Sequence, residues 1–405
     1  MGRTEVPPST LKILLYLPTP GGMNGAPRRL LALACGLRDL GVIPIIATEP
    51  GTPFMAAARK AGIESVALCP VGVLALRERA LFGGGPLFRL RVALALLRQQ
   101  LRVRHTLREA RADVVWLRAS KSIAFAGLGV LLARRPLVWD IDGELPSRGM
   151  VRLLHHAGLA LARRVVFQHD AAREIFGDRL AQRHAAKLRV LTPGIDMETL
   201  GAARDRRAVE PLAEEGRFRV LQVGTLCDRK NQAFLIEALH RLPPAIRQRV
   251  ELRFVGGTHS AAYERALRDQ AAAYGLTAQV HFLGWRDDVH SLMQDSDLLA
   301  MPSKSEGVPN TVQEAMVLGL PVLGSDRGGI PDVLIHEKTG WVLPLGDPAP
   351  WARTLATIAD DTHARAEVAA SARSHAEQHF GTDVWSRRYL GILREAVAAE
   401  GAPRP

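Results

Sequence analysis

Residues 297–326 read DLLAMPSKSEGVPNTVQEAMVLGLPVLGSD, and the class of the fold can be inferred from this segment. Two short apolar runs, DLLAMPS and PVLGSD, lie on either side of a helical segment that starts at Thr311. Two buried strands joined through a helix form the repeating unit of a parallel sheet. The stretch therefore predicts a strand–helix–strand unit of an α/β fold.

The same alternation continues outward through the second half of the chain. Short apolar runs read as strands, and helical patterns such as NQAFLIEALHRL separate them. Strands that alternate with helices favour a doubly wound parallel sheet. The runs are FRVLQVG (218–224), VELRFVGG (250–257), QVHFLGW (279–285) and WVLPL (341–345).

A second series of this kind occupies the first half. It begins with KILLYL (12–17), the glycine-rich loop PTPGGMNGAP and a helical pattern from Arg28 to Leu40. A chain of 405 residues suits two domains of roughly 200 residues each. The sequence thus predicts two Rossmann-like sheets. The later strands of the first are VIPIIAT (42–48), DVVWL (113–117), PLVWDID (136–142), RRVVFQ (163–168) and the start of LRVLTPGID (188–196).

The domain boundary is predicted from a loss of apolar periodicity. Residues 197–216 are polar and lack a strong apolar period, which is typical of an interdomain linker. The prediction is a first domain at 1–196, a linker at 197–216 and a second domain at 217–380. Residues 381–405 are expected to form a C-terminal helix and tail that pack back toward the first domain.

Charge is divided unequally between the halves. Residues 1–200 carry 29 basic against 15 acidic side chains, a net charge of +14, and residues 201–405 carry 24 against 26, a net charge of −2. A basic half suits nucleic acid, an anionic membrane surface or an anionic acceptor, although arginines can also decorate a solvated surface. The three cysteines lack the spacing of a zinc site or a disulfide framework.

The most basic segment is FRLRVALALLRQQLRVRHTLREAR, residues 88–111, in which arginines surround leucines at helical spacing. A basic amphipathic helix suits an anionic membrane surface, and a helix packed on the sheet with a solvated basic face is the alternative. Aromatic residues are not interleaved with these cations, which argues against nucleic acid. Without an apolar run of about 18 residues or a signal-type N-terminus, the sequence predicts a cytoplasmic protein, with peripheral contact at the inner membrane face.

Two glutamates frame the turn in the opening stretch. Glu306 precedes the turn that contains Gly307 and Pro309, and Glu314 lies one turn into the helix. The first turn of a helix presents backbone N–H groups and the positive end of the dipole, which together bind phosphate. Glu314 could accept two hydrogen bonds from a ribose diol, and Glu306 could face sugar hydroxyls. The alternative is that Glu314 is a solvated helix residue and Glu306 a helix cap.

Residues 303–344 resemble the donor-binding signature of retaining glycosyltransferase family 4, EGxPNxxxEAMAxGxPVVxxxxGGxxE. Upstream, VGTLCDRKNQAFLIEAL and VHFLGWRDDVHSLMQDSDLLAMPS are similar to two further segments of that family. The resemblance implies the GT-B fold, in which two Rossmann-like domains face each other across a cleft. The signature is matched at Glu306, Gly307, Pro309, Asn310, Glu314, Ala315, Met316, Gly319, Pro321, Val322, Gly328 and Gly329, with Asp332 where the family usually has Glu.

The resemblance also implies roles for individual residues. Lys230 would contact the donor phosphates and neutralise the leaving nucleoside diphosphate, Glu306 would orient the sugar, and Glu314 would hold the ribose. The catalytic residues implied are Lys230, Glu306 and Asp142. The donor-binding residues implied are Gly25, Thr225, Arg229, Lys230, Glu306, Gly307, Val308, Pro309, Asn310, Thr311, Val312 and Glu314.

Specific expectations attach to three positions, Thr225, Asp142 and Gly25. Thr225 stands where the family has Arg, which removes one expected cation, and Arg229 is the candidate replacement. In the first half, Asp142 of PLVWDIDGELP stands where the family commonly has His near the sugar ring, or else belongs to a solvated loop. Gly25 of GGMNG aligns with the family's N-terminal glycine loop, where the backbone could approach a phosphate closely.

The predicted function is a retaining, hexosyltransferase-like glycosyltransferase that moves a sugar from a nucleotide diphosphate sugar to an acceptor hydroxyl, with a lipid-linked envelope glycan as candidate acceptor. No metal or other cofactor is expected, because Asp140 and Asp142 have metal-pair spacing but lie in the half away from the phosphate turn. Two alternatives remain: a nucleotide-sugar-binding protein with weak catalysis, and a nucleotide-sugar epimerase on the same fold.

Overall fold

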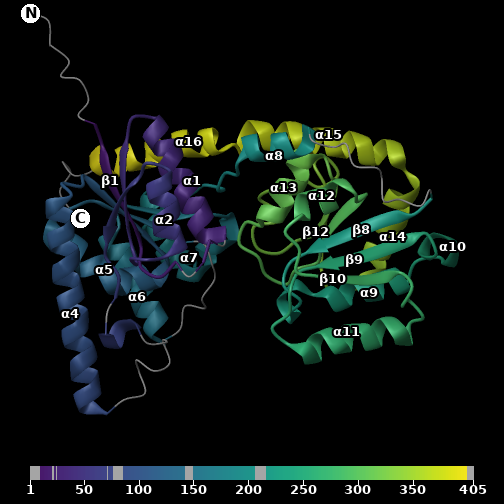
Figure 1. Ribbon diagram of the computed structural model, residues 1–405, viewed down its shortest axis with the longest axis horizontal. Helices are drawn as coiled ribbons and strands as arrows, with labels where there is room; N and C mark the ends of the chain where they lie inside the picture. The colour runs from purple at the N-terminus through teal and green to yellow at the C-terminus, as the bar shows by residue number, and fades with distance from the viewer. Residues whose placement is uncertain are drawn as a thin grey trace, which may run out of the picture. The chain divides into compact units, whose positions relative to one another are not determined.

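The computed structural model describes residues 10–20, 22–23, 25–70, 72–75, 85–141, 149–205 and 216–398. The chain divides into two compact units: unit 1 comprises Met1–Gly194 with Thr382–Pro405, and unit 2 comprises Ile195–Gly381. Each unit is built on one parallel sheet with helices on both faces (Figure 1). The predicted fold class of two doubly wound α/β domains is therefore confirmed.

Unit 1 contains a seven-stranded sheet in the order β3-β2-β1-β4-β5-β6-β7. Its strands are parallel, and Leu14 of β1 lies opposite Ile45 of β2 and Val115 of β4. Strands that are buried on both faces read as continuous apolar runs, which is why the sequence marks most of them. They are β1 (Lys12–Leu17), β2 (Ile43–Thr48), β3 (Glu64–Ala67), β4 (Val114–Arg118), β5 (Leu137–Ile141), β6 (Arg164–Phe167) and β7 (Leu188–Val190).

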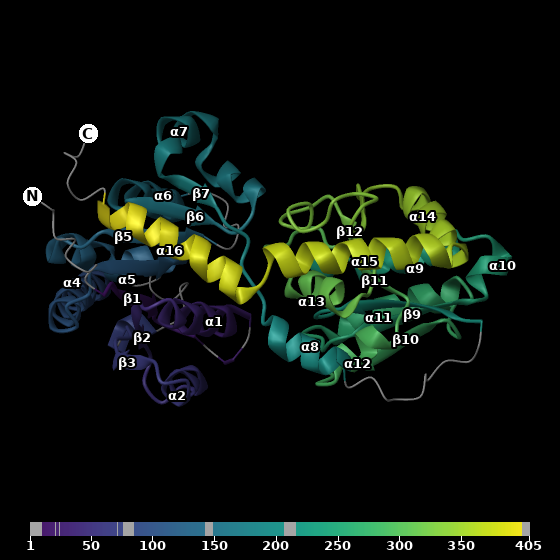
Figure 2. The same cartoon turned by 90° about the horizontal axis from the view of Figure 1, so that it is seen from above.

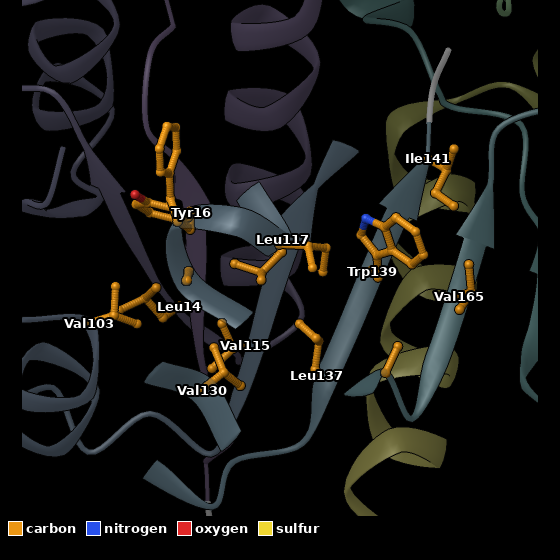
Figure 3. Packing of buried hydrophobic residues seen from close by; sticks show 14 of the residues in the cluster. Leu14, Tyr16, Val103, Val115, Leu117, Val130, Leu137, Trp139, Ile141 and Val165 are labelled. Atoms are coloured by element: carbon orange, nitrogen blue, oxygen red, sulfur yellow. The ribbon is translucent and has the colours of Figure 1, made fainter. Parts of the chain in front are cut away.

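Helices α4 (Pro86–Glu109), α5 (Ala119–Ala133) and α6 (Gly149–Leu161) cover one face of this sheet and share a hydrophobic core with it. Figure 3 shows that core, with Leu14, Val115 and Trp139 on neighbouring strands. The opposite face carries α1 (Gly25–Asp39) and α2 (Pro53–Lys60). The described residues of the unit also form the short helices η1 (Gly72–Ala75), η2 (Asp170–Phe176), α7 (Asp178–Arg183) and η3 (Ala185–Lys187).

The C-terminal helix α16 (Thr382–Ala398) belongs to unit 1 although the chain reaches it only after unit 2. It packs along α1 and against β4, β5 and β6 (Figure 2). Tyr389 of α16 is fully buried, accepts a 2.6 Å hydrogen bond from Trp116 Nε1 and donates one of 3.0 Å to Asp140 Oδ2. Burial, and then the Asp140 carboxylate, raises the pKa of Tyr389 well above its usual value.

Unit 2 contains a six-stranded parallel sheet in the order β10-β9-β8-β11-β12-β13. One face is covered by α9, α11 and α14, and the other by α8, α12, α13 and α15. The strands are β8 (Phe218–Val223), β9 (Val250–Val255), β10 (Val280–Gly284), β11 (Leu298–Met301), β12 (Val322–Ser325) and β13 (Trp341–Leu343). The helices are α8 (Met197–Asp205), η4 (Asp228–Lys230), α9 (Gln232–His240), α10 (Pro244–Arg247), α11 (Ala261–Ala273), α12 (Val289–Gln294), α13 (Asn310–Leu318), α14 (Pro348–Asp360) and α15 (Thr362–His379).

The prediction of a linker at 197–216 is wrong for its first part. Met197–Asp205 form α8, which packs against α12 and α13 inside unit 2, and residues 206–215 lie outside the described residues. Asp196 caps this helix by accepting from Thr199 N at 3.0 Å. Among the residues of α8 whose burial is described, Leu200 is buried in the core and Met197 is partly buried against it, so the apolar period is too sparse to show in the sequence.

Among the helices that the structure describes, none is long and apolar enough to cross a membrane.

Candidate donor site at the strand-order switch of unit 2

The predicted site residues of unit 2 lie at the carboxyl ends of β8 and β11. β8 is the first strand of the sheet; β9 and β10 follow on one side of it, and β11, β12 and β13 on the other. The strand order therefore reverses between β8 and β11. In open α/β sheets, ligands bind outside the carboxyl ends of the strands at such a switch point. Lys230 follows β8 and Glu306 follows β11, so the topology brings them to this position.

Two cations converge on one carboxylate here. Lys230 Nζ lies 2.7 Å from Glu306 Oε1, and Arg229 Nη1 lies 3.0 Å from Glu306 Oε2. The side chains of Lys230 and Glu306 are only 11% and 8% exposed, whereas that of Arg229 is 52% exposed. Charge-assisted contacts of this kind are stronger than neutral hydrogen bonds. Two positive charges against one negative charge leave the cluster with one net positive charge.

Lys230 is held in place by its own backbone and by the glycine beside it. Its carbonyl oxygen accepts a 2.7 Å hydrogen bond from Gln222 Nε2, a side chain of β8. The next residue, Asn231, has a φ of 58° and donates from Nδ2 to Pro302 O at 3.1 Å. Gly224 lies under the lysine stem, where an added Cβ would be 2.9 Å from Lys230 Cε. The loop after β8 therefore fixes where the ammonium group lies.

Glu306 is held by the loop that follows β12. Gly329 N donates to the carbonyl oxygens of Glu306 and Gly307 at 3.3 and 3.0 Å. Gly328 has a φ of +58°, and an added Cβ there would lie 1.9 Å from Glu306 O. Any larger residue at this glycine would have to displace the backbone that carries Glu306. The Gly328-Gly329 pair of the sequence signature thus shapes the site.

The turn after Glu306 leads directly into α13, with Pro309 at the N-cap position. The side chain of Pro309 makes no capping hydrogen bond. The N-cap residue therefore does not offset the positive end of the helix, which favours an anion at its first turn. Of the predicted phosphate donors, Val312 N already donates to Pro309 O at 3.2 Å. The hydroxyl oxygen of Thr311 is buried and has no hydrogen-bond partner among the described residues, and a ligand would satisfy it.

Glu314 lies farther along α13 and is not part of the Lys230–Glu306 cluster. Its Oε2 is 3.8 Å from Nε2 of His290, on the neighbouring helix α12. Sequence reasoning missed His290, because a single histidine on a different helix carries no motif. The remaining unit 2 residues, Gly307, Val308 and Thr225, lie in the same loops, and Thr225 O accepts from Gln232 Nε2 at 3.2 Å.

Two of the predicted site residues, Gly25 and Asp142, belong to unit 1. Gly25 is the first residue of α1, after β1, and Asp142 lies outside the described residues. Asp140, two positions earlier, is described and buried: its oxygens accept from Gln168 Nε2 at 3.1 Å and Tyr389 OH at 3.0 Å. Asp140 therefore tethers the C-terminal helix and is not a solvated loop residue.

Comparison with known proteins agrees with this geometry. The family model described as glycosyl transferases group 1 matches residues 204–375. The D-inositol 3-phosphate glycosyltransferase of Salinispora arenicola is 33% identical over 232 residues, 53% of this chain and 51% of that protein. The amylovoran biosynthesis glycosyltransferase AmsK of Erwinia amylovora is 27% identical over 221 residues, 52% and 51% of the two chains. The matched regions span about half the length of these relatives.

The fold is shared over almost the whole chain. The crystal structure of Anabaena HepE in complex with UDP-glucose superposes with a TM-score of 0.71 at 23% sequence identity, covering 95% of this chain and 99% of HepE. At that identity the likeness concerns the fold, which is the GT-B arrangement of two Rossmann-like domains expected from the sequence. The Lys230–Glu306 pair and the signature around α13 both lie within residues 204–375, the part of this chain that matches the model of the group 1 glycosyl transferases.

Proposed function

We propose that this protein is a retaining, metal-independent glycosyltransferase that transfers a sugar from a nucleotide diphosphate sugar to an acceptor hydroxyl. The observation that carries the proposal is the convergence of Lys230 and Arg229 on Glu306, beside the N-terminus of α13, whose N-cap residue Pro309 makes no capping hydrogen bond. This arrangement supplies positive charge and backbone donors at one point, which suits a diphosphate next to a sugar.

Each residue then has a defined role. Lys230 and Arg229 contact the diphosphate, and the first turn of α13 binds it through backbone N–H groups. Glu306, released in part from its cations by the phosphates, accepts hydrogen bonds from the sugar and orients it. Glu314 holds the ribose diol, with His290 beside it. UDP-glucose is the first donor to test, since HepE binds it on the same fold.

In the proposed reaction, the bond between the sugar's anomeric carbon and the phosphate oxygen breaks while a bond to the acceptor oxygen forms on the same face. The acceptor proton passes to the departing phosphate oxygen. Positive charge develops on the sugar and negative charge on the leaving diphosphate, and Lys230 with the α13 dipole stabilises the latter. Configuration at the anomeric carbon is retained because attack and departure share one face.

The proposal needs no divalent metal at the diphosphate. Glu306 is the acidic side chain next to the phosphate position, and both of its oxygens face cations. A carboxylate neutralised in this way is a poor ligand for Mg²⁺, which binds through free carboxylates and phosphate oxygens. Neutralisation of the leaving group is therefore assigned to Lys230, Arg229 and the helix dipole.

The acceptor is proposed to be a lipid-linked glycan of an envelope polysaccharide, reached from the cytoplasmic side. The name of AmsK, a biosynthetic enzyme of amylovoran, supports a polysaccharide pathway. The net charge of +14 on residues 1–200 would attract an anionic, diphosphate-bearing acceptor.

Release of nucleoside diphosphate tests the function. The protein should release UDP from UDP-glucose faster in the presence of an acceptor extract than in its absence. Epimerisation would change the sugar without acceptor dependence, and a binding protein without catalysis would retain UDP-glucose unchanged. Either outcome would reject transferase activity. Binding without catalysis has to be tested because Thr225 stands where the family that the sequence resembles has Arg.

A further inference from the structure

Helix α4 presents a row of exposed leucines on the outside of unit 1. Residues Leu87, Leu90, Leu94, Leu97 and Leu101 are each between 47% and 66% exposed. Their spacing alternates between three and four residues, so they form one narrow stripe along four turns of the helix. Leucine side chains in a soluble helix normally face the core, and a continuous exposed row of this kind marks an interaction surface.

The stripe is exposed because the opposite side of α4 is firmly attached. Gln99 and Gln100 are buried: Gln99 Nε2 donates to Tyr16 OH at 3.2 Å, and Gln100 Nε2 donates to Ala124 O at 2.7 Å. Gln100 Oε1 also accepts from Gly129 N of α5 at 2.8 Å. These bonds fix the rotation of α4 about its own axis, so the leucines cannot turn inward without breaking buried hydrogen bonds.

Positive charge borders the stripe. Arg91 and Arg98 are exposed and lie one heptad apart, each one residue after a leucine of the row. Helix α4 contains six arginines and a single acidic residue, Glu109, which pairs with His105 at 3.1 Å.

The neighbouring helices add further exposed leucines, Leu128 and Leu132 on α5 and Leu153 on α6. Figure 1 shows α4, α5 and α6 on the same side of the unit 1 sheet.

We propose that this leucine–arginine face, defined as the five leucines of the stripe with Arg91 and Arg98, docks on an anionic lipid bilayer. The leucines enter the boundary between headgroups and acyl chains, and the arginines contact lipid phosphates. A second copy of the chain is the other candidate for a stripe of this spacing. Pairing two such stripes would bring the arginines of both α4 helices together, with Glu109 as the single acidic residue on each helix, and this opposes self-association.

Vesicle flotation at low salt tests the proposal independently of catalysis. Wild-type protein is expected to float with vesicles of phosphatidylcholine and phosphatidylglycerol and to remain unbound with phosphatidylcholine alone. The triple variant Leu90→Ser, Leu94→Ser, Leu97→Ser and the double variant Arg91→Gln, Arg98→Gln should each lower the partition coefficient about tenfold or more. Arg102 and Arg104 are left intact, because Arg102 bonds to Cys69 O and Gln99 Oε1 and Arg104 is partly buried.

The matched controls lie on exposed positions elsewhere. Ile335→Ser removes an exposed apolar side chain of unit 2, and Arg265→Gln with Arg353→Gln removes two exposed charges there. These controls should float like the wild type, and all variants should keep the wild-type melting temperature and affinity for UDP. The proposal is overturned if wild-type protein ignores anionic vesicles, or if the leucine variant floats equally well. A dimer in sedimentation that the leucine substitutions convert to a monomer would assign the face to self-association and likewise overturn it.

Discussion

The two cations on Glu306 should contribute unequally to donor binding, because they differ in burial. The Lys230 side chain is 11% exposed and that of Arg229 is 52% exposed. A charge-assisted hydrogen bond contributes about 1.5–3 kcal/mol when it is shielded from solvent, and an exposed ion pair about 0.2–1 kcal/mol. At about 1.4 kcal/mol per factor of ten, Lys230→Gln should raise the Kd for UDP roughly 10- to 100-fold, and Arg229→Gln no more than about fivefold.

Isothermal titration calorimetry with UDP measures both effects, and salt separates them. The loss from Arg229→Gln should shrink as the ionic strength rises, since exposed charges are screened beyond about 10 Å at 0.1 M salt. The loss from Lys230→Gln should persist. Lys338→Gln, at an exposed position of the same unit, is the matched control. Melting temperatures must accompany the titrations, because removing Lys230 leaves the buried Glu306 carboxylate with one cation.

The loop after β8 also offers a gain-of-function test. Thr225 stands where the family that the sequence resembles has Arg, and the threonine side chain is partly exposed. Thr225→Arg, introduced into the Arg229→Gln variant, should restore UDP affinity toward the wild-type value. This result is expected if Arg229 contacts the diphosphate in place of the arginine that the family has at position 225. If Lys230→Gln and Arg229→Gln lower the UDP affinity equally, the unequal contributions of the two cations are refuted. If Thr225→Arg restores no affinity in the Arg229→Gln variant, the role assigned to Arg229 is refuted.

Three further predictions follow from the site and the core. Glu314→Ala should weaken UDP and UDP-glucose binding together by about tenfold or more, because both carry the ribose; unchanged calorimetric affinity would reject the ribose role. Turnover should survive EDTA, and a loss that added Mg²⁺ restores would reject metal independence. Burial, and then the neighbouring His156, lowers the pKa of His155 from its ordinary value of 6.5. The protein should therefore lose stability as the pH falls below 6.5, because the unfolded chain binds the proton more readily than the folded one. In His155→Phe, the urea midpoint should depend less steeply on pH. An unchanged slope of midpoint against pH would contradict this.

The strands were predictable where burial on both faces makes them continuous apolar runs. KILLYL and VIPIIAT became β1 and β2 within one residue. β3 escaped notice because it lies at the edge of the sheet, has only four residues, and begins with the exposed Glu64. Helix α8 was mistaken for a linker because the two core residues of its described part, Leu200 and Met197, are too few to show a clear apolar period.

For the site, the sequence supplied residues but not their distances. Glu306 and the turn into α13 were marked by a local motif, and Lys230 by a second motif about 75 residues earlier in the chain. Arg229 and Lys230 contact the same carboxylate because the loops after β8 and β11 approach each other. No local sequence pattern encodes that approach. The exposure of the leucines on α4 was equally hidden, since alternating leucines and arginines read the same whether a helix turns them inward or outward.

The tether between Tyr389 and Asp140 has a consequence for how the protein is made. Because unit 1 needs α16, its hydrophobic core remains incomplete on the ribosome until that helix has emerged, whereas all of unit 2 precedes it. Unit 2 can therefore finish folding first, reversing the usual N-terminal-first order of synthesis. During that interval, the side of the nascent sheet that later receives Trp385, Tyr389 and Leu393 stays open. A premature stop after residue 381 would release a chain with a finished second unit and an apolar surface exposed to chaperones and proteases.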